Sequence, residues 1–340
     1  MSQSLRTRIL KTVQYLVGAL ALAWAFGQVE WGRASALLAD ASPRTVVALV
    51  GVSTVGLLAL AATWHVLLDR CRPTRFRTAT STGLIVLFVN QLLPSRLSGR
   101  AVAPFVVHNR TGIGYPESIA VSGVHTGLYA LLYGFVALVG VGLGLARLPL
   151  GLVALLFGST VLYGVGGALA LLAGTNMAAM ARLVGVLTTV FERVPRIGDR
   201  LVELVEQVPS FTAASADSFR TLSTDPGVVF RYAVAWAISL LVVPGIRVWL
   251  LFETLGTGFE PVLLLPVYLL TAYSVTLLPL TPGGIGVTEA TATAVFVALG
   301  VPETVVVPTI FVDRLLGTYL PALLGWYPSL QVDLSGLVSD

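Results

Sequence analysis

The sequence is poor in charge, cysteine and histidine, and each shortage excludes a class of protein. Only 11% of the 340 residues are charged and 56% are hydrophobic, whereas soluble domains carry about 25% charged residues. A soluble globular domain and a disordered chain are both excluded, because water does not tolerate so much exposed apolar surface. The single cysteine, Cys71, excludes an internal disulfide and a cysteine-based metal cluster. The three histidines lack the paired spacing of a zinc site, so we expect neither a metal nor a cofactor.

Lysine is almost absent, since one Lys accompanies 20 Arg in a chain of net charge +4. These cations form short clusters beside apolar runs, as in residues 6–11 and 70–77. Such clusters are typical of the cytoplasmic ends of membrane helices and not of a surface that binds nucleic acid. The chain is therefore predicted to be an all-α polytopic protein of the cell membrane, with residues 1–340 forming a single membrane domain.

Long apolar runs dominate what is present. Six of them are long enough, as helices, to cross about 30 Å of hydrocarbon. They cover residues 13–29, 45–68, 117–144, 149–173, 228–252 and 302–327. The first is interpreted as a retained span, because no small-residue cleavage site follows it. Residues 174–227 form a polar insert whose apolar residues recur at helical spacing, which predicts amphipathic helices on the membrane surface or, alternatively, a small soluble cap.

Two further apolar stretches, residues 79–93 and 261–279, are interrupted by Pro and Gly where a helix should continue. Irregular backbone at membrane depth is tolerated only where it is buried in protein or lines a cavity. We therefore predict two re-entrant helical hairpins. The alternative is an ordinary span that ends in a loop.

The two hairpins belong to an internal repeat. Pro116-Glu117-Ser118 matches Pro302-Glu303-Thr304, 186 residues further on, and each match precedes a full span. Three spans separate the hairpins, so the hairpins enter from opposite faces. The segments between spans carry 15 Arg and Lys on the predicted inside and 3 on the outside, which favours two cytoplasmic termini. We predict an inverted repeat with a midplane site, its first half being 1–144 and its second half 149–173 and 228–330.

The second hairpin carries the most specific motif. LLPLTPGGIGVTEA, then GVPE, then Asp313-Arg314, resembles the lysylphosphatidylglycerol synthase transmembrane-region family, also called flippase-like. The first half is similar through Asn90, Pro94 and Gly99. The resemblance implies a membrane protein that moves lipids between leaflets, such as aminoacylated phosphatidylglycerol or polyprenyl-phosphate sugars, and that works with a separate transferase. Arg100 stands where the family usually has Glu, which is consistent with a different substrate.

An ionisable residue at membrane depth costs about 2.5–3.5 kcal/mol, so each one needs a partner or a function. The candidate substrate-binding residues are Arg96, Arg100, Gly283, Gly284, Gly286, Glu289, Asp313 and Arg314. In this hypothesis arginine binds a lipid phosphate, Glu289 neutralises Arg314 in the empty state, and glycine amides cradle the phosphate. Asp313 is interpreted as charge compensation for its neighbour. Alternatively, a Glu289–Arg314 pair only fixes the hairpin to the last span, and Arg96 and Arg100 are interfacial residues.

The sequence shows no constellation of catalytic residues, and the PGGIG turn lacks the GK[ST] of a nucleotide-binding loop. We therefore expect a protein that is not an enzyme and whose partners are anionic membrane lipids. A membrane enzyme, or an enzyme subunit, of lipid-linked sugar pathways is the alternative from another class. A structural scaffold whose polar centre only holds helices together is the third.

Overall fold

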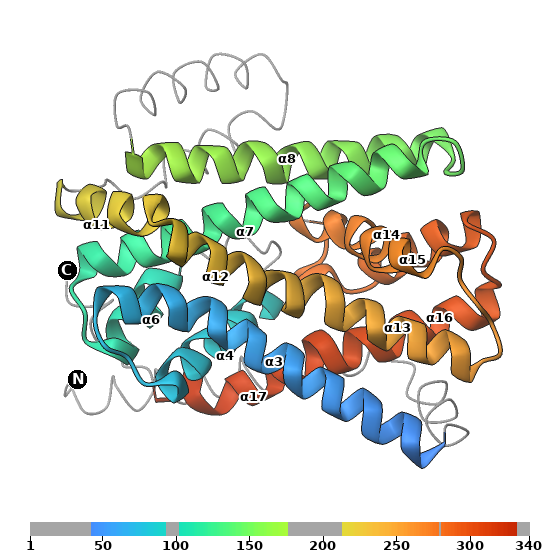
Figure 1. Cartoon of the computed structure of the whole chain (residues 1–340), viewed down its shortest axis with the longest axis horizontal. Helices are drawn as coiled ribbons and strands as arrows, with labels where there is room; N and C mark the ends of the chain where they lie inside the picture. The colour runs from blue at the N-terminus through green and yellow to red at the C-terminus, as the bar shows by residue number, and fades with distance from the viewer. Residues whose placement is uncertain (1–41, 93–101, 176–212, 279, 332–340) are drawn as a thin grey trace, which may run out of the picture.

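The computed structural model of the chain describes residues 42–92, 102–175, 213–278 and 280–331, and within these ranges every regular element is helical (Figure 1). Five helices are long and apolar enough to cross a membrane. They are Pro43–Cys71, Tyr115–Gly144, Leu150–Leu172, Pro226–Thr254 and Glu303–Ser329. They correspond to five of the six predicted spans, and the predicted span 13–29 lies outside the described residues.

The elements follow one another with few irregular connections. In chain order they are α3 (Pro43–Cys71), α4 (Phe76–Leu92), α6 (Ala103–Thr111), α7 (Tyr115–Gly144), α8 (Leu150–Thr175), α11 (Ala213–Thr224), α12 (Pro226–Ala237), the π-turn η1 (Ile238–Val242), α13 (Val243–Thr254), η2 (Val262–Leu264), α14 (Leu265–Ala272), η3 (Tyr273–Leu277), η4 (Pro282–Gly284), α15 (Val287–Ala298), α16 (Glu303–Arg314), the π-turn η5 (Leu315–Tyr319) and α17 (Leu320–Ser329). Proline at the start of α3 and α12 suits the first helical turn, where its missing N–H has no partner to lose.

Helix α3 runs antiparallel to the long helix formed by α12, η1 and α13 (Figure 1). At one end Arg70 lies 3.3 Å from Asp225, and at the other Leu49 and Leu251 share a buried cluster. Asp225 also caps α12 by accepting the N–H groups of Gly227 and Val228. The pKa of Asp225 is lowered, first by the Val228 N–H and next by Arg70.

Helices α7 and α8 form a closely packed antiparallel hairpin, because glycines lie where the two backbones meet. A Cβ atom added at Gly134 would lie 2.9 Å from the backbone nitrogen of Gly164. One added at Gly167 would lie 2.7 Å from that of Leu131. Small residues at such contacts are typical of membrane helices, where dispersion rather than the hydrophobic effect holds neighbours together. Of the predicted amphipathic insert, residues 176–212 lie outside the described residues, and α11 packs Phe219 and Leu222 beside α7.

The second interrupted stretch reverses direction at membrane-helix depth. Val262–Leu277 is followed by a turn in which Gly283, Gly284 and Gly286 all have positive φ, and the chain returns as Val287–Ala298. Only glycine adopts this backbone without strain, so the turn depends on these residues. Both limbs are apolar but shorter than a full span. The first stretch likewise places α4 beside the short helix α6, with residues 93–101 between them outside the described residues.

Each interrupted stretch packs against the last long helix of the other half. Helix α4 lies along α17, where a Cβ atom at Gly325 would clash with the Leu84 carbonyl. Helix α14 lies along α7, where a Cβ atom at Gly140 would clash with Thr271 and where Tyr133 donates to the Leu270 carbonyl at 2.8 Å. The two halves are therefore interlocked rather than merely adjacent.

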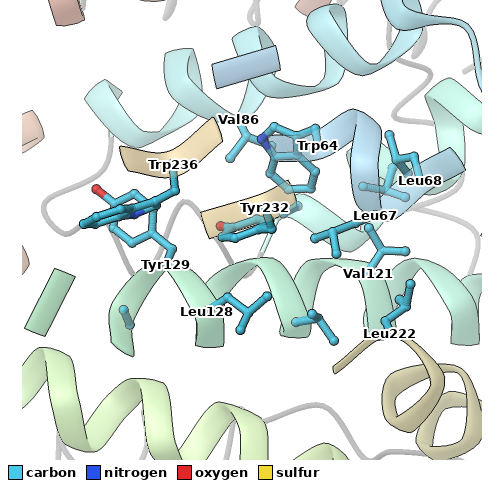
Figure 2. Packing of buried hydrophobic residues seen from close by; sticks show 14 of the residues in the cluster. Trp64, Leu67, Leu68, Val86, Val121, Leu128, Tyr129, Leu222, Tyr232 and Trp236 are labelled. Atoms are coloured by element: carbon cyan, nitrogen blue, oxygen red, sulfur yellow. The ribbon is translucent and has the colours of Figure 1, made fainter. Parts of the chain in front are cut away.

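Aromatic rings fill the interior where α3, α7 and α12 meet (Figure 2). Trp64 stacks on His125 with ring centroids 4.0 Å apart, and Tyr133 stacks on Tyr163 of α8 at 4.4 Å. The hydroxyl of Tyr232 donates to the His125 carbonyl at 3.0 Å. Offset and edge-on ring pairs of this kind add stabilisation beyond their buried area.

Candidate functional site

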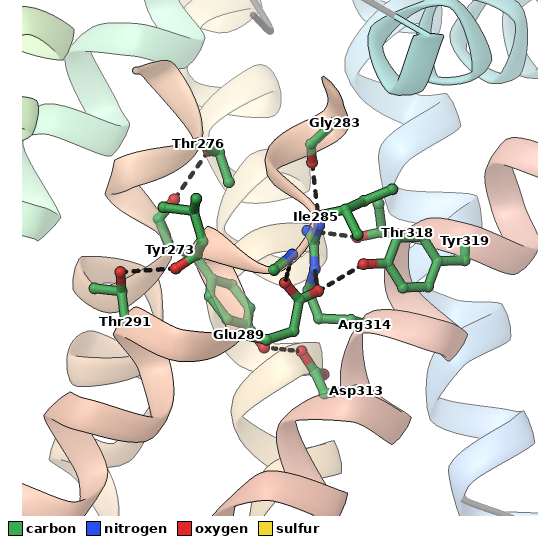
Figure 3. Close-up of polar contacts among 12 residues, drawn as sticks. Tyr273, Thr276, Gly283, Ile285, Glu289, Thr291, Asp313, Arg314, Thr318 and Tyr319 are labelled. Atoms are coloured by element: carbon green, nitrogen blue, oxygen red, sulfur yellow. Dashed lines mark hydrogen bonds and ion pairs between the residues drawn. The ribbon is translucent and has the colours of Figure 1, made fainter. Parts of the chain in front are cut away.

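Arg314 is the centre of a buried polar cluster at the glycine turn (Figure 3). Its side chain is 1% exposed, and its Nε lies 3.0 Å from Oε1 of Glu289. The two terminal nitrogens donate to the Thr318 hydroxyl at 3.3 Å and to the Gly283 carbonyl at 3.2 Å. The guanidinium thus links the end of α16 to the turn and to the start of α15.

Glu289 has three partners. Besides Arg314, it accepts the Tyr319 hydroxyl at 2.6 Å on Oε1 and the Gly286 N–H at 2.7 Å on Oε2. It is the third residue of α15, where a carboxylate caps the first turn and favours the positive end of the helix dipole. Its side chain is 23% exposed, so it is much less enclosed than Arg314.

The glycine amides are partly engaged by the protein itself. The Gly286 N–H binds Glu289, and the Gly284 N–H donates to the Thr281 carbonyl at 3.0 Å. The turn therefore positions Glu289 in the empty state, and the expected phosphate cradle would require these bonds to be exchanged.

Asp313 belongs to a second ion pair, and the expectation that it compensates its neighbour Arg314 is wrong. Arg247 of α13 approaches its Oδ1 with Nε at 2.8 Å and Nη2 at 2.7 Å. The Tyr273 hydroxyl donates to Oδ2 at 2.8 Å. Consecutive residues of a helix point about 100° apart, so Asp313 and Arg314 face different partners.

Three residues of the cluster were not predicted as site residues, namely Arg247, Tyr273 and Tyr319. Arg247 carries the clearest sequence signal, because it is a charge inside an otherwise apolar run. The tyrosines carry none. Their rings lie 5.8 Å and 5.1 Å from the Arg314 guanidinium carbon, within cation–π range.

A cavity of about 130 Å³ adjoins the cluster. Arg247, Asp313 and Arg314 line it on one side. Residues of the aromatic interior line it as well, contributed by α3 and α7; they are Trp64, His125, Tyr129 and Tyr133. Two further lining residues, Ser53 and Asn90, have a buried oxygen without a hydrogen-bond partner. The cavity therefore joins a charged surface to an aromatic one and offers free hydrogen-bonding capacity.

The remaining predicted site residues and the metal prediction can be placed only in part. Arg96 and Arg100 lie outside the described residues. Within the described ranges, no three His, Cys, Asp or Glu side chains converge in a way that could hold a metal ion.

The geometry can be set beside known proteins. A family profile described as the lysylphosphatidylglycerol synthase TM region matches residues 12–325. The chain belongs to this family. Together with the five candidate spans, membership makes the chain an integral membrane protein of a lipid-related family.

One curated relative of this family member is the UPF0104 membrane protein PH1989 of Pyrococcus horikoshii, which is 32% identical over 94 residues. The aligned part is 27% of this chain and 26% of the relative, so the chain matches about a quarter of that protein's length. No solved structure matches this lysylphosphatidylglycerol synthase transmembrane-region chain with statistical significance.

Proposed function

We propose that this protein binds an anionic membrane lipid at the Arg314 cluster and moves it between the leaflets of the cell membrane. The observation that carries the proposal is a buried arginine, held at the break between two short helices, that lines a cavity between the interlocked halves. Arginine suits a phosphate because its planar fork donates two parallel hydrogen bonds and stays charged when buried.

An inverted repeat supports the proposal. Pro116 and Pro302 are 186 residues apart, and the same shift relates the bounds of α3 to α12–α13, of α4 to Val262–Leu277, of α6 to α15 and of α7 to α16–α17. The two members of the first pair run in opposite directions. Inverted halves with broken helices at corresponding positions are typical of transporters, whose substrate sites lie at the interface of the repeats.

The repeat is chemically unequal, and this too supports a site in the second half. The shift that relates the halves places Leu128 at the position of Arg314, Gly127 at that of Asp313 and Ala61 at that of Arg247. The first half instead supplies the aromatic surface of the cavity. A lipid headgroup would thus meet charge on one side and rings on the other.

The test replaces the charges while keeping the volume. The double variant Glu289→Gln, Arg314→Met is compared with wild type in liposomes that contain a fluorescent anionic phospholipid, whose transbilayer movement is followed by quenching from outside. We expect the double variant to fold and to lose this movement. Native mass spectrometry of both proteins should show that the variant retains less co-purified lipid.

A matched control removes an ion pair far from the cavity. The variant Arg70→Met, Asp225→Asn takes away one charge of each sign at an exposed contact, and Asn still caps a helix. We expect wild-type lipid movement from this control. Undiminished movement in the Glu289, Arg314 variant would refute the proposal and leave the pair as a structural contact.

A further inference from the structure

The ionised side chains of the cluster form a neutral set. Arg247 pairs with Asp313 and Arg314 pairs with Glu289, and both pairs are shielded from water. A phosphate that arrives with one negative charge leaves this set with a net charge of −1. Uncompensated charge in such a place is costly, so a bound phosphate needs either an accompanying cation or the loss of one negative charge.

The two carboxylates are unequal in how easily they can give up their charge. Asp313 is 2% exposed and receives two N–H groups of Arg247 and the Tyr273 hydroxyl. Glu289 is 23% exposed and receives a single N–H of Arg314. As a neutral acid, Glu289 keeps an oxygen for the Gly286 N–H and gains an O–H that can donate to the Tyr319 hydroxyl.

We propose that Glu289 takes up one proton when an anionic lipid phosphate binds. This inference rests on the proposed function. The proton adds to the Glu289 carboxylate, the phosphate replaces that carboxylate on the Arg314 guanidinium, and no bond of the lipid breaks. The set has zero net charge before and after the exchange.

The surroundings of Glu289 favour this exchange. The groups that face it are Arg314 from α16, Tyr319 from η5 and Tyr273 from η3. Helices α14 and α8, which also pack against α15, contribute no charged residue. Arg314 is thus the charge that holds Glu289 ionised in the empty site, and a phosphate on Arg314 removes that stabilisation.

His125 is a titratable side chain elsewhere on the cavity wall. Its Nδ1 lies 3.1 Å from the Tyr232 hydroxyl, and its ring stacks on Trp64. Neither neighbour carries a negative charge that would stabilise an imidazolium. The geometry therefore assigns the proton to Glu289.

The experiment uses the wild-type protein in detergent and dihexanoyl phosphatidylglycerol, which carries one negative charge and no group that titrates near neutral pH. Proton uptake on binding is measured with a pH indicator in weakly buffered solution, and Kd is measured against pH. We expect about one proton per bound lipid and, where Glu289 is ionised in the free protein, a rise in Kd of about tenfold per pH unit. In Glu289→Gln the uptake and the pH dependence should both disappear.

The outcomes separate the two proposals. Binding of the probe without proton uptake by wild type overturns this inference and leaves the proposed function standing. A wild-type protein that does not bind the probe at any pH counts against the proposed function itself. Proton uptake that survives in Glu289→Gln and disappears in His125→Gln overturns the assignment to Glu289. The wild-type measurement requires no variant to fold.

Discussion

The Arg314–Glu289 pair predicts an unequal loss of stability when either partner is removed. Breaking a buried pair costs about 3–5 kcal/mol, because the remaining charge has no counter-ion. Glu289→Gln leaves the Arg314 charge behind at 1% exposure, whereas Arg314→Met leaves the Glu289 charge at 23% exposure with two hydrogen-bond donors still in place. The first variant should therefore lose about 4–5 kcal/mol of unfolding free energy and the second about 3 kcal/mol.

The double variant completes the cycle. Gln and Met together leave no unpaired charge, so much of the loss should be restored, and the coupling energy between the two positions should be several kcal/mol. The free energy of unfolding would be measured by titration with a denaturing detergent in mixed micelles. The exposed pair of Arg70 and Asp225 serves as the comparison, and we expect little coupling there.

Two results would refute this reasoning. If Arg314→Met were the more damaging variant, the exposure of the remaining charge would not set the loss. If the two single losses simply added in the double variant, the pair would not be a coupled unit in the folded protein.

Three further predictions follow from other parts of the fold. Gly325→Ala should destabilise the protein by about 1–3 kcal/mol through overpacking against α4, whereas Gly158→Ala, with open space around it, should be neutral or stabilising by up to about 1 kcal/mol in thermal unfolding. The lowered pKa of Asp225 means that its contribution to stability is complete above the ordinary carboxyl pKa and is lost as the pH falls through the lowered value; melting temperatures of Asp225→Asn should accordingly depend less on acidification than those of wild type. In a background without the native cysteine, cysteines at Thr224 and Gly258 should be labelled from opposite faces of the membrane, the first from the cytoplasm; labelling from one face would contradict the predicted topology.

The long helices could be predicted from the sequence because each is an uninterrupted apolar run with polar ends. The predicted run 45–68 lies within Pro43–Cys71, and 228–252 lies within Pro226–Thr254. The glycine turn could be predicted as well, since Gly283, Gly284 and Gly286 stand where a helix should continue and all three have positive φ. Both signals are local, so a single sequence contains them.

The partners of the charges could be predicted only where the chain itself supplies a clue. Glu289 and Arg314 stood out because each is an ionisable residue near a predicted break, and the structure places them in contact. Arg247 and Asp313 are 66 positions apart in sequence, and only the packing of α13 against α16 brings them together. Sequence adjacency suggested Arg314 as the partner of Asp313, but the turn of the helix separates neighbouring side chains.

The π-turns could not be predicted, because an extra residue in one helical turn leaves the apolar pattern almost unchanged. One of them begins directly after Arg314 and ends at Tyr319. Such turns are often found at functional sites. Here the wider turn accompanies the contact of Arg314 with Thr318 and that of Tyr319 with Glu289.

The pairing of opposite charges at the centre also decides how the molecule responds to voltage. A lone Arg314 carried across the membrane would exchange about 2.3 kcal/mol with each 100 mV of transmembrane potential. Paired with Glu289, and with Arg247 paired to Asp313, it exchanges none, because the opposite charges move together. Rearrangement of the two halves around this centre is therefore electrically silent, and a resting potential neither drives it nor holds it back.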